Sequence, residues 1–438
     1  MKHVLILGSG FAGVEVLKQL QKKFNGDDDV KISLVSRDNF LLFTPMLPEV
    51  SSGMIETRHI ITPVRAFCHK AKFYQATLES VDFGGKKVVF AHAVGNEAEA
   101  GSYNRHSLEY DFLVIALGSE TNFFGMKDVE QYSFTMKNID DAIALRNHVI
   151  SMLEQGSIEQ ENNELRRKLL TFVVVGGGFN GVETVGELND FVRDSIKTSY
   201  TNILMTDARV ILVNATDKIL EEVGEELGNY ALQKLKQKGV EFIMNTQATG
   251  ATAGSVKLDK GPEIPCYTIV WATGVTPSKF VANLECRHDK GHRIITNSYL
   301  EVENHKGVYA LGDCASTTDP MTGKPYPPTA QHAIGEAKVA AKNIICDING
   351  KDDERIKFEY KAKGMMAEIG KRTGVATLFG LKIHGFVAWW LWRTFYLANL
   401  PTSKKKLKVM LDWTMDLFFK PDVAMIRGMR EAKEIQLE

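Results

Sequence analysis

Residues 8–15 read Gly-Ser-Gly-Phe-Ala-Gly-Val-Glu, and residues 176–183 repeat the stretch as Gly-Gly-Gly-Phe-Asn-Gly-Val-Glu. Six of the eight positions are identical in the two copies. A short apolar run precedes each copy, at residues 4–7 and 172–175, and apolar residues at helical spacing follow it. Each copy therefore predicts a strand, a tight glycine turn and a helix.

Three glycines at this spacing are the fingerprint of a dinucleotide-binding turn. The first glycine turns the chain, the second lets the backbone approach a pyrophosphate, and the third lets the helix pack on the strand. The N-terminus of the helix then faces the phosphates. One copy would be weak support, but two copies in the same context predict two dinucleotide sites in an α/β protein with two Rossmann-like domains.

Three further apolar runs support this fold class. Residues 112–119, 268–275 and 307–313 each end in small residues, as expected for a buried parallel strand that leads into a ligand crevice. The last of them ends in Gly312 and Asp313, which places a carboxylate at the end of a strand. In contrast, residues 91–109 are polar and without periodicity, and they predict a surface loop.

The composition excludes several classes of protein. In 438 residues, 53 Lys and Arg nearly balance 54 Asp and Glu, so no global charge attracts nucleic acid, and we predict no nucleic-acid partner. The five cysteines are scattered and show no CxxC spacing, which argues against a disulfide scaffold or a metal site. The N-terminal apolar run is too short for a secretory signal, and we expect a reducing compartment.

The C-terminal region has a different character. Residues 386–400 form an aromatic-rich helical pattern with Arg393 near its middle, and its apolar stretch is shorter than the ~20 residues of a membrane span. Lysines at 404–406 and 408 precede a second apolar helix, 407–419, with one narrow polar stripe. The pattern predicts amphipathic helices that lie on an anionic bilayer surface. A helical hairpin that packs in a core or forms a dimer is the alternative.

These features together resemble the two-dinucleotide-binding-domain flavoproteins, and among them the type II NADH dehydrogenases, which are single-subunit, non-pumping NADH:quinone oxidoreductases. The motifs that carry the resemblance are the two fingerprints, residues 40–50 (Phe-Leu-Leu-Phe-Thr-Pro-Met-Leu-Pro-Glu-Val), 272–277, 309–315 and 327–331 (Pro-Pro-Thr-Ala-Gln), and the Trp-rich C-terminus. The resemblance implies FAD on the first repeat, NADH on the second with NADPH as an alternative, and a membrane quinone as acceptor. It also implies a peripheral enzyme on the cytoplasmic side of the cell membrane, with a homodimer as an open alternative.

Under this resemblance the domains are an FAD-binding domain of residues 1–120 and 285–350, an NAD(P)H-binding domain of residues 121–284, and a membrane-anchoring C-terminal region of residues 351–438.

The resemblance also implies roles for single residues. Glu183 and Gln331 are the implied catalytic residues, with Glu183 between the nicotinamide and quinone sides and Gln331 on the segment that lines the quinone pocket. Thr44 and Pro45 would lie beside the flavin, and Asp313 would bind the ribityl chain. The residues implied to bind the cofactors are Gly8, Gly10, Phe11, Ala12, Gly13, Ser36, Arg37, Thr44, Pro45, Leu78, Gly118, Gly176, Gly178, Phe179, Asn180, Gly181, Glu183, Asn214, Thr273, Gly274, Gly312, Asp313, Ala330 and Gln331.

The chain departs from the family pattern at several positions. Ser36 stands where an acid would bind the adenosine ribose, so ribose binding is either weaker or uses Asp38. Asn214 replaces the corresponding acid of the second repeat without an adjacent Arg, so the preference between NADH and NADPH stays open. Gly335 replaces the second Gln of the quinone motif, and His332 is inserted between small residues.

Other flavoproteins of this architecture are the main alternatives. Disulfide reductases and sulfide:quinone oxidoreductases need cysteines beside the flavin, and in this chain Cys314 is the cysteine nearest to the predicted site. A flavin-containing redox sensor without turnover is a non-enzymatic alternative. Two nucleotide sites favour turnover, and an assay with NADH and a quinone separates these hypotheses.

Overall fold

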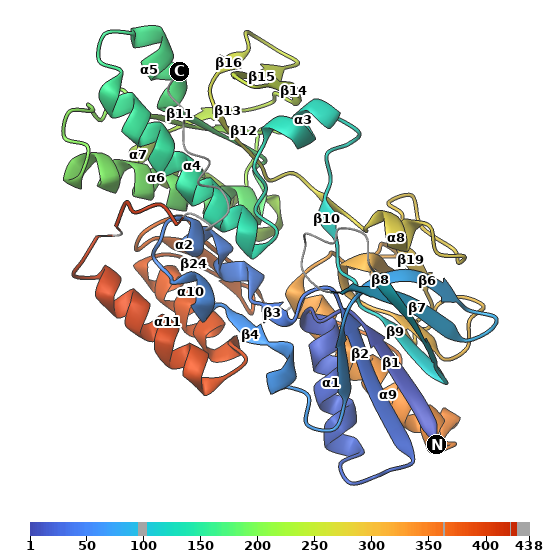
Figure 1. The fold of residues 1–438 in the computed structure, drawn as a ribbon. Coiled ribbons are helices and arrows are strands. Elements are labelled where there is room, and N and C mark those ends of the chain that lie inside the picture. Colours follow the sequence, from blue (N-terminus) through green and yellow to red (C-terminus); the bar gives the residue numbers. More distant parts are fainter. Residues whose placement is uncertain (95–102, 362–363, 421, 427–438) are drawn as a thin grey trace. The chain divides into compact units, whose positions relative to one another are not determined.

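In the computed structural model, which describes residues 1–94, 103–361, 364–420 and 422–426, the chain forms two compact units (Figure 1). Unit 1 comprises residues 1–42, 61–120 and 275–361, and unit 2 comprises residues 43–60, 121–274 and 362–438. The C-terminal region is therefore divided between the units. Residues 43–60, which we assigned to the first domain from the sequence, belong to unit 2.

Unit 1 is built on a five-stranded parallel sheet with the order β20-β9-β1-β2-β5. Its strands are β1 (Lys2–Leu7), β2 (Val30–Ser36), β5 (Lys72–Gln75), β9 (Phe112–Ile115) and β20 (Val308–Ala310). The central strand β1 is buried on both faces from Val4 to Leu7, as its continuous apolar sequence requires. The predicted strands at residues 4–7 and 112–119, and the one that begins at 307, thus lie side by side.

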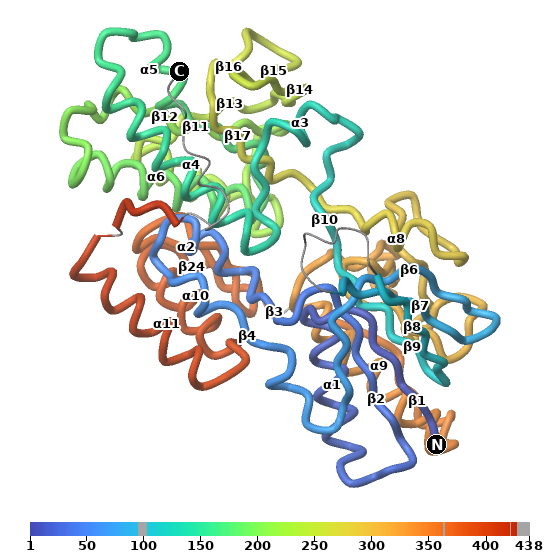
Figure 2. The backbone as a smooth tube through the Cα atoms, viewed as in Figure 1, coloured from blue at the N-terminus to red at the C-terminus, as the bar shows by residue number. Residues whose placement is uncertain are grey.

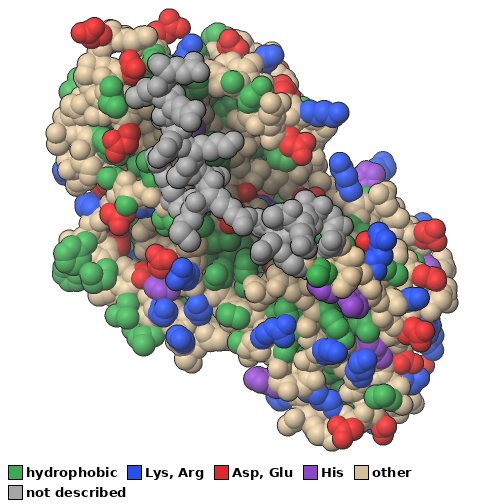
Figure 3. All heavy atoms as spheres, in the orientation of Figure 1, with side chains coloured by type: hydrophobic (Ala, Val, Ile, Leu, Met, Phe, Trp, Pro, Cys, Tyr) green, Lys and Arg blue, Asp and Glu red, His purple; other side chains and the backbone are tan. Residues whose placement is uncertain are grey.

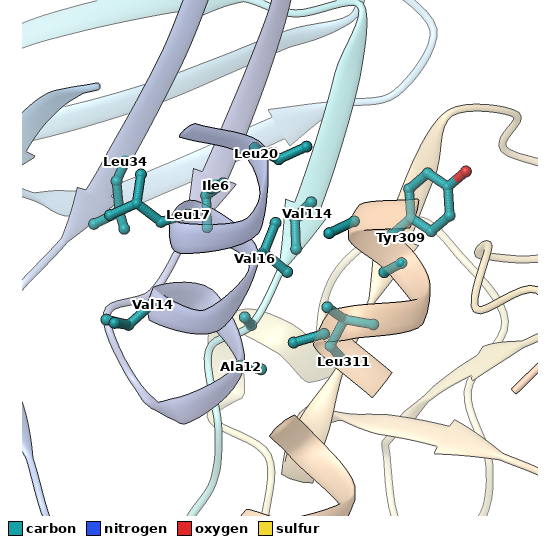
Figure 4. Close-up of a cluster of buried hydrophobic side chains, with 14 of the residues drawn as sticks. Ile6, Ala12, Val14, Val16, Leu17, Leu20, Leu34, Val114, Tyr309 and Leu311 are labelled. Atoms are coloured by element: carbon teal, nitrogen blue, oxygen red, sulfur yellow. The ribbon is translucent and has the colours of Figure 1, made fainter. Parts of the chain in front are cut away.

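Two helices cover one face of this sheet. The helices α1 (Phe11–Lys23) and α9 (Ala330–Ile348) pack there, and Leu17 and Leu20 of α1 meet Ile6 of the sheet in the core that Figure 4 draws. Because α1 packs on the sheet through its apolar face, its first turn lies at the carboxyl end of β1. That edge is where parallel sheets of this class bind ligands.

An antiparallel sheet covers the other face. It consists of β6 (Thr77–Asp82), β7 (Lys87–Ala93) and β8 (Tyr103–Glu109), and Val88 and Phe90 of β7 join Leu5 and Leu7 in a second core. The predicted loop at residues 91–109 was therefore wrong at both ends, while residues 95–102 lie outside the described residues. The seven residues of β8 are exposed or half-buried, so they carry no apolar alternation that would reveal a strand.

The smaller elements of unit 1 connect this frame. They are β3 (Phe40–Leu42), β4 (Ile61–Pro63), α8 (Lys279–Ala282), β19 (Ile294–Thr296) and β21 (Ala315–Thr317), with short 3-10 turns at Thr57–His59 of unit 2 and Val64–Ala66, Gly312–Cys314 and Asp352–Glu354 of unit 1. At the borders of the units stand the two-residue strands β10 (Glu120–Thr121) and β18 (Val275–Thr276).

Unit 2 contains a four-stranded parallel sheet with the order β13-β12-β11-β17. Its strands are β11 (Thr171–Val175), β12 (Arg209–Val213), β13 (Val240–Ile243) and β17 (Thr268–Trp271), accompanied by the small sheet of β14 (Ala248–Thr252), β15 (Ser255–Leu258) and β16 (Ile264–Pro265). Its helices are α3 (Lys127–Tyr132), α4 (Ile139–Ile158), α5 (Asn163–Leu169), α6 (Phe179–Thr198) and α7 (Glu225–Gln237). The predicted α/β class with two Rossmann-like sheets is confirmed.

The rest of unit 2 comes from both ends of the chain. The short α2 (Leu47–Ser51), the antiparallel sheet β22 (Gly364–Glu368), β23 (Gly374–Leu378) and β24 (Leu381–Gly385), and the helices α10 (Phe386–Asn399) and α11 (Ser403–Asp416) pack together, and Figure 2 traces this path. A Cβ atom on Gly186 of α6 would lie 2.8 Å from the Gly370 nitrogen, so α6 packs directly on the turn after β22. Among the described residues, no helix is long and apolar enough to cross a bilayer.

Candidate active site

The first fingerprint forms the turn between β1 and α1. Gly8 has φ +102°, and a Cβ atom there would lie 2.2 Å from the Ala116 carbonyl oxygen. A Cβ atom on Gly13 would lie 2.0 Å from the carbonyl oxygen of Gly8. Gly10 is the N-cap of α1 and, as a glycine, has no side chain that could cap the helix. The turn therefore lets the positive end of the helix dipole face an anion, as a pyrophosphate site requires.

Three loops of unit 1 surround the carboxyl edge of its sheet. Ser36 ends β2 and its hydroxyl lies 2.9 Å from the hydroxyl of Ser9, whereas the neighbouring Arg37 is exposed and ion-paired with Asp38 at 3.5 Å. After β9, Gly118 turns with φ +66°. The region thus contains the residue types of a nucleotide site, although residue 36 is a serine where an acid would bind the ribose.

Asp313 lies in the 3-10 turn that follows β20. The Ser119 hydroxyl donates to its carboxylate at 2.6 Å, which fixes the side chain across two adjacent strand ends. Gly312 has φ +70°, and its amide donates to Glu336 of α9 at 2.6 Å. Burial raises the pKa of Glu336 to about 8. No motif in the sequence points to Glu336, which stands beside the departure at Gly335.

Gln331 and Ala330 lie in the first turn of α9, which Thr329 caps by accepting from the His332 amide. The Tyr360 hydroxyl donates to Gln331 Oε1 at 2.9 Å and so orients the amide. The His332 ring packs between aromatic rings, with its centroid 4.4 Å from that of Tyr360.

The same aromatic cluster explains Gly335. A Cβ atom on Gly335 would lie 3.2 Å from the Tyr360 ring and 3.3 Å from the Phe358 ring. The glycine therefore makes room for the segment after α9 that positions Gln331.

The second fingerprint repeats the geometry of the first in unit 2. Gly176 has φ +119°, and a Cβ atom on Gly181 would lie 1.9 Å from the Gly176 carbonyl oxygen. Gly178 is the N-cap of α6 and provides no side-chain cap, and Phe179 and Asn180 form the first turn of the helix. Thr273 and Gly274, with φ +64° at Gly274, follow the adjacent strand β17.

Asn214 stands at the end of β12, directly beside this second turn. Its Oδ1 accepts from the Gly177 amide at 2.9 Å, and its Nδ2 donates to the Lys218 carbonyl at 2.7 Å. The register in which Val175 pairs with Val213 brings it there. Because both ends of the amide already have partners in the protein, Asn214 stabilises the turn whatever it does for the ribose.

The remaining predicted residues divide between the units. Phe11 and Ala12 form the first turn of α1, and Leu78 lies half-buried in β6. Thr44 and Pro45 form a 3-10 turn, Thr44–Met46, at the start of the 43–60 segment of unit 2, before α2.

Glu183 lies in the second turn of α6, after the fingerprint glycines. Its Oε1 accepts from the Trp392 indole and from the Glu368 amide, each at 3.2 Å. Burial, with a smaller contribution from the charge of the nearby Glu187, raises the pKa of Glu183 to about 8. The side chain keeps partial exposure, and a carboxyl with a pKa in this range suits the role of a general acid near neutral pH.

Cys314 cannot serve as a redox cysteine here. It is fully buried, its thiol donates to the carbonyls of Leu311 and Ile115, and burial raises its pKa to about 12. A thiol without thiolate character is a poor nucleophile. This geometry does not favour the cysteine-dependent alternatives.

Comparisons with known proteins show the family of this chain. Residues 2–337 match the family model described as pyridine nucleotide-disulphide oxidoreductase, and residues 362–422 match the one described as NDH2 C-terminal domain. A probable NADH dehydrogenase of Dictyostelium discoideum is 32% identical over 97% of this chain and 91% of its own. A type II NADH:quinone oxidoreductase of Mycobacterium tuberculosis is 31% identical over 94% of this chain and 87% of its own.

Solved structures share the fold. NDH2 from Plasmodium falciparum, solved with NADH, superposes with a TM-score of 0.87 at 21% identity and covers 97% of this chain and 99% of its own. The sulfide:quinone oxidoreductase of Aquifex aeolicus superposes with a TM-score of 0.70 at 17% identity and covers 96% of each chain. From the family models and the two relatives above 30% identity, the chain belongs to the pyridine nucleotide-disulphide oxidoreductase family and, within it, to the type II NADH:quinone oxidoreductases.

Proposed function

We propose that this protein is a peripheral membrane flavoenzyme that passes a hydride from NADH to FAD and then two electrons to a membrane quinone, without pumping protons. The observation that carries the proposal is the duplicated glycine turn, with Gly13 and Gly181 each held against a backbone carbonyl, one turn per unit. Two pyrophosphate sites can bind two dinucleotides, and two bound dinucleotides can transfer a hydride from one to the other.

The residues of unit 1 fit FAD. Gly8, Gly10 and Gly13 would hold its pyrophosphate at the start of α1, and Asp313 would accept from a hydroxyl of its ribityl chain. Bound FAD supplies a ring that accepts a hydride and releases two electrons. Gly176, Gly178 and Gly181 would hold the pyrophosphate of NADH, with NADPH as the alternative that Asn214 leaves open.

The experiment that tests the proposal follows the flavin colour. We expect the purified protein to be yellow with about one FAD per chain, because unit 1 has one fingerprint. NADH should bleach it without oxygen, and a short-chain quinone should restore the colour. A protein that stays colourless after reconstitution with FAD would contradict the proposal, and reconstituted vesicles that acidify during turnover would contradict its non-pumping part.

In this proposal Glu183 gives a proton to the quinone, and Gln331, oriented by Tyr360, binds a quinone oxygen. Glu183→Gln keeps the acceptor for the Trp392 indole but carries no acidic proton. The quinone half-reaction is expected to slow about a hundredfold, the lower range for a general acid, while flavin reduction by NADH changes little. Stopped-flow records give the rate of flavin reduction by NADH and the rate of quinone reduction separately. Equal slowing of the two reactions would show that Glu183 is a structural residue.

The C-terminal helices support membrane attachment in a way that differs from the sequence pattern. The polar stripe of α11 turns inward, where Asp412 meets His59 and Asp416 meets Lys371 at 3.2 Å. Arg393 is buried rather than near a bilayer. The large apolar side chains that remain exposed on α10, on α11 and just after α11 are together called the apolar patch: Phe386, Val387, Trp390, Phe395, Leu407, Met410, Leu411, Met415, Leu417, Phe418 and Phe419. Figure 3 shows apolar side chains beside lysines on the face that it draws.

We expect this apolar patch to insert into the cytoplasmic face of an anionic membrane. Each large side chain contributes about 1.5–3 kcal/mol when fully buried, more than the ~1 kcal/mol of a lysine near anionic lipid. The triple variant Trp390→Ser, Phe418→Ser, Phe419→Ser should lose vesicle binding at least about a hundredfold and keep NADH oxidation with a water-soluble acceptor.

Met321→Ser is the matched control, because Met321 is also highly exposed but lies in unit 1. Sedimentation with anionic vesicles measures binding, and unchanged sedimentation of the triple variant would place the anchor elsewhere. If the triple variant instead changes from dimer to monomer in solution, the patch is a homodimer contact.

A further inference from the structure

Unit 2 buries an unusual group of carboxyls behind Glu183. The acid cluster consists of Glu49 on α2, Glu183 and Glu187 on α6, and Glu368 at the end of β22. Glu49 and Glu187 are each 1% exposed and Glu368 is 2% exposed, whereas Glu183 keeps partial exposure. The proposed function uses Glu183 alone, so the three buried members need another explanation.

The charge in this region does not balance the acids. Arg393 approaches Glu49 at 3.4 Å and is held between the rings of Trp389 and Trp413 at 4.1 and 4.6 Å. One guanidinium can offset one carboxylate. The other charged or titratable groups that act on the cluster are Asp190 on α6, Lys238 after α7 and Tyr396 on α10. Lys238 is already paired with Asp190 at 2.7 Å, so it brings little net charge.

Neutral donors orient every member of the acid cluster, including Glu49, which Arg393 also contacts. Three indoles each donate to a different member: Trp389 to Glu368 at 2.6 Å, Trp392 to Glu183 at 3.2 Å, and Trp413 to Glu49 at 2.8 Å. The Ser52 hydroxyl donates to Glu187 at 2.7 Å. An indole N–H orients a carboxyl without neutralising it, so the oriented acids still need protons.

Two buried oxygens give independent support for bound protons. Glu49 Oε2 and Glu187 Oε1 have no hydrogen-bond partner among the described residues. A carboxylate oxygen without a hydrogen bond in a water-free interior is very unfavourable, whereas a neutral, protonated carboxyl loses far less free energy in the same place. In agreement, burial raises the pKa of Glu49 to about 8 and that of Glu187 to about 7, and it raises the pKa of Glu368 as well.

We propose that the three buried members of the acid cluster form a proton store that keeps Glu183 protonated and delivers the proton consumed in each turnover. This inference rests on the proposed function. The charges of other members raise the pKa of Glu49 and of Glu368, and Glu183 is the partly exposed member through which the store exchanges its proton. The three buried acids act through Glu183 and are positioning residues.

The step balances with one proton. NADH, a quinone and one H⁺ give NAD⁺ and a quinol, so the hydride supplies one hydrogen and both electrons, and the protein must supply the second hydrogen as a proton. The O–H bond of Glu183 breaks as an O–H bond forms on the quinone. A proton from the cluster then returns to Glu183, and one proton from water refills the cluster.

The first test titrates the FAD-bound enzyme without NADH or quinone. Infrared difference spectra follow the C=O stretch of protonated carboxyls between about pH 6 and about pH 9. We expect the band to disappear over this range in the wild type and to lose amplitude in Glu368→Gln and in Glu187→Gln. Glu301→Gln is the matched control, because Glu301 is also buried but is ion-paired with Arg355 at 2.6 Å.

The second test measures the pH profile of quinone reduction by the pre-reduced enzyme. Glu187→Gln removes a charge that raises the pKa of Glu183, so the alkaline inflection should move down by about one pH unit. The rate at about pH 8 then falls about fivefold, while the rate at about pH 6 changes little. A purely structural defect would lower the rate equally at both values.

The outcomes separate the two hypotheses. A wild type that never reduces a quinone contradicts the proposed function, but the infrared titration still reports on the store. Unchanged amplitude and an unchanged inflection in both Gln variants overturn the store. If either Gln variant fails to fold, Trp389→Phe serves instead: it removes the donor to Glu368 and keeps the acid, so the carboxyl band should persist to higher pH, and a band that does not move overturns the store.

Discussion

Gly13→Ala is expected to yield a protein that cannot retain FAD. The added Cβ atom would lie 2.0 Å from the Gly8 carbonyl oxygen, a backbone atom that has no room to move because Gly8 itself packs against the carbonyl of Ala116. Helix α1 would have to leave the sheet. Such a clash costs about 3 kcal/mol or more, which lowers the Tm by about 6–12 °C for a unit of this size.

A matched variant separates folding from cofactor binding. A Cβ atom on Gly10 meets nothing within 4 Å, so Gly10→Ala should lose at most about 1 kcal/mol, the effect of a weaker N-cap. It should still bind FAD more weakly, because its methyl group stands where the pyrophosphate approaches. Flavin content and thermal unfolding measure the two effects. A yellow, stable Gly13→Ala protein would contradict the geometry of the first turn.

Arg393→Met is expected to destabilise the protein by about 3–5 kcal/mol at alkaline pH and by less at acid pH. Methionine fills a similar volume between the indoles but leaves Glu49 without a cation. The pKa of Glu49 is raised from 4.5 to about 8 in the folded protein. Glu49 therefore binds its proton more tightly in the folded protein than in the unfolded chain. The contribution of this proton to the free energy of unfolding is largest below about pH 4.5 and is lost as the pH rises towards 8.

Arg393 lowers the pKa of Glu49, so Arg393→Met raises that pKa further. The loss of stability with rising pH then continues to a higher pH than in the wild type. Urea unfolding of the wild type and of Arg393→Met across this pH range measures the difference. The double variant Arg393→Met, Glu49→Gln should recover most of the stability, because it no longer buries an unpaired carboxylate. A deficit that is the same at every pH, or a double variant without recovery, would show that Arg393 acts through packing alone.

The family assignment that the motifs suggested is confirmed by the matches over residues 2–337 and 362–422. The catalytic roles of Glu183 and Gln331, the membrane surface and the coenzyme preference stay predictions. The C-terminal tryptophans show why. From their sequence they suggested an interfacial helix, but Trp389, Trp392 and Trp413 are buried donors to carboxyls, and Trp390 alone among these four is exposed.

The sequence alone determined the two nucleotide turns, because their constraints are local. The clash between Gly13 and the Gly8 carbonyl, and its copy at Gly181, arises within six residues and needs no distant partner. Buried parallel strands can likewise be predicted from continuous apolar runs in the sequence. Only the tertiary structure decided the acid cluster: Glu49 and Arg393 are 344 residues apart, and no periodicity links them. Burial, which the whole fold produces, raises the pKa of all four glutamates, and the local sequence does not show how buried a side chain will be.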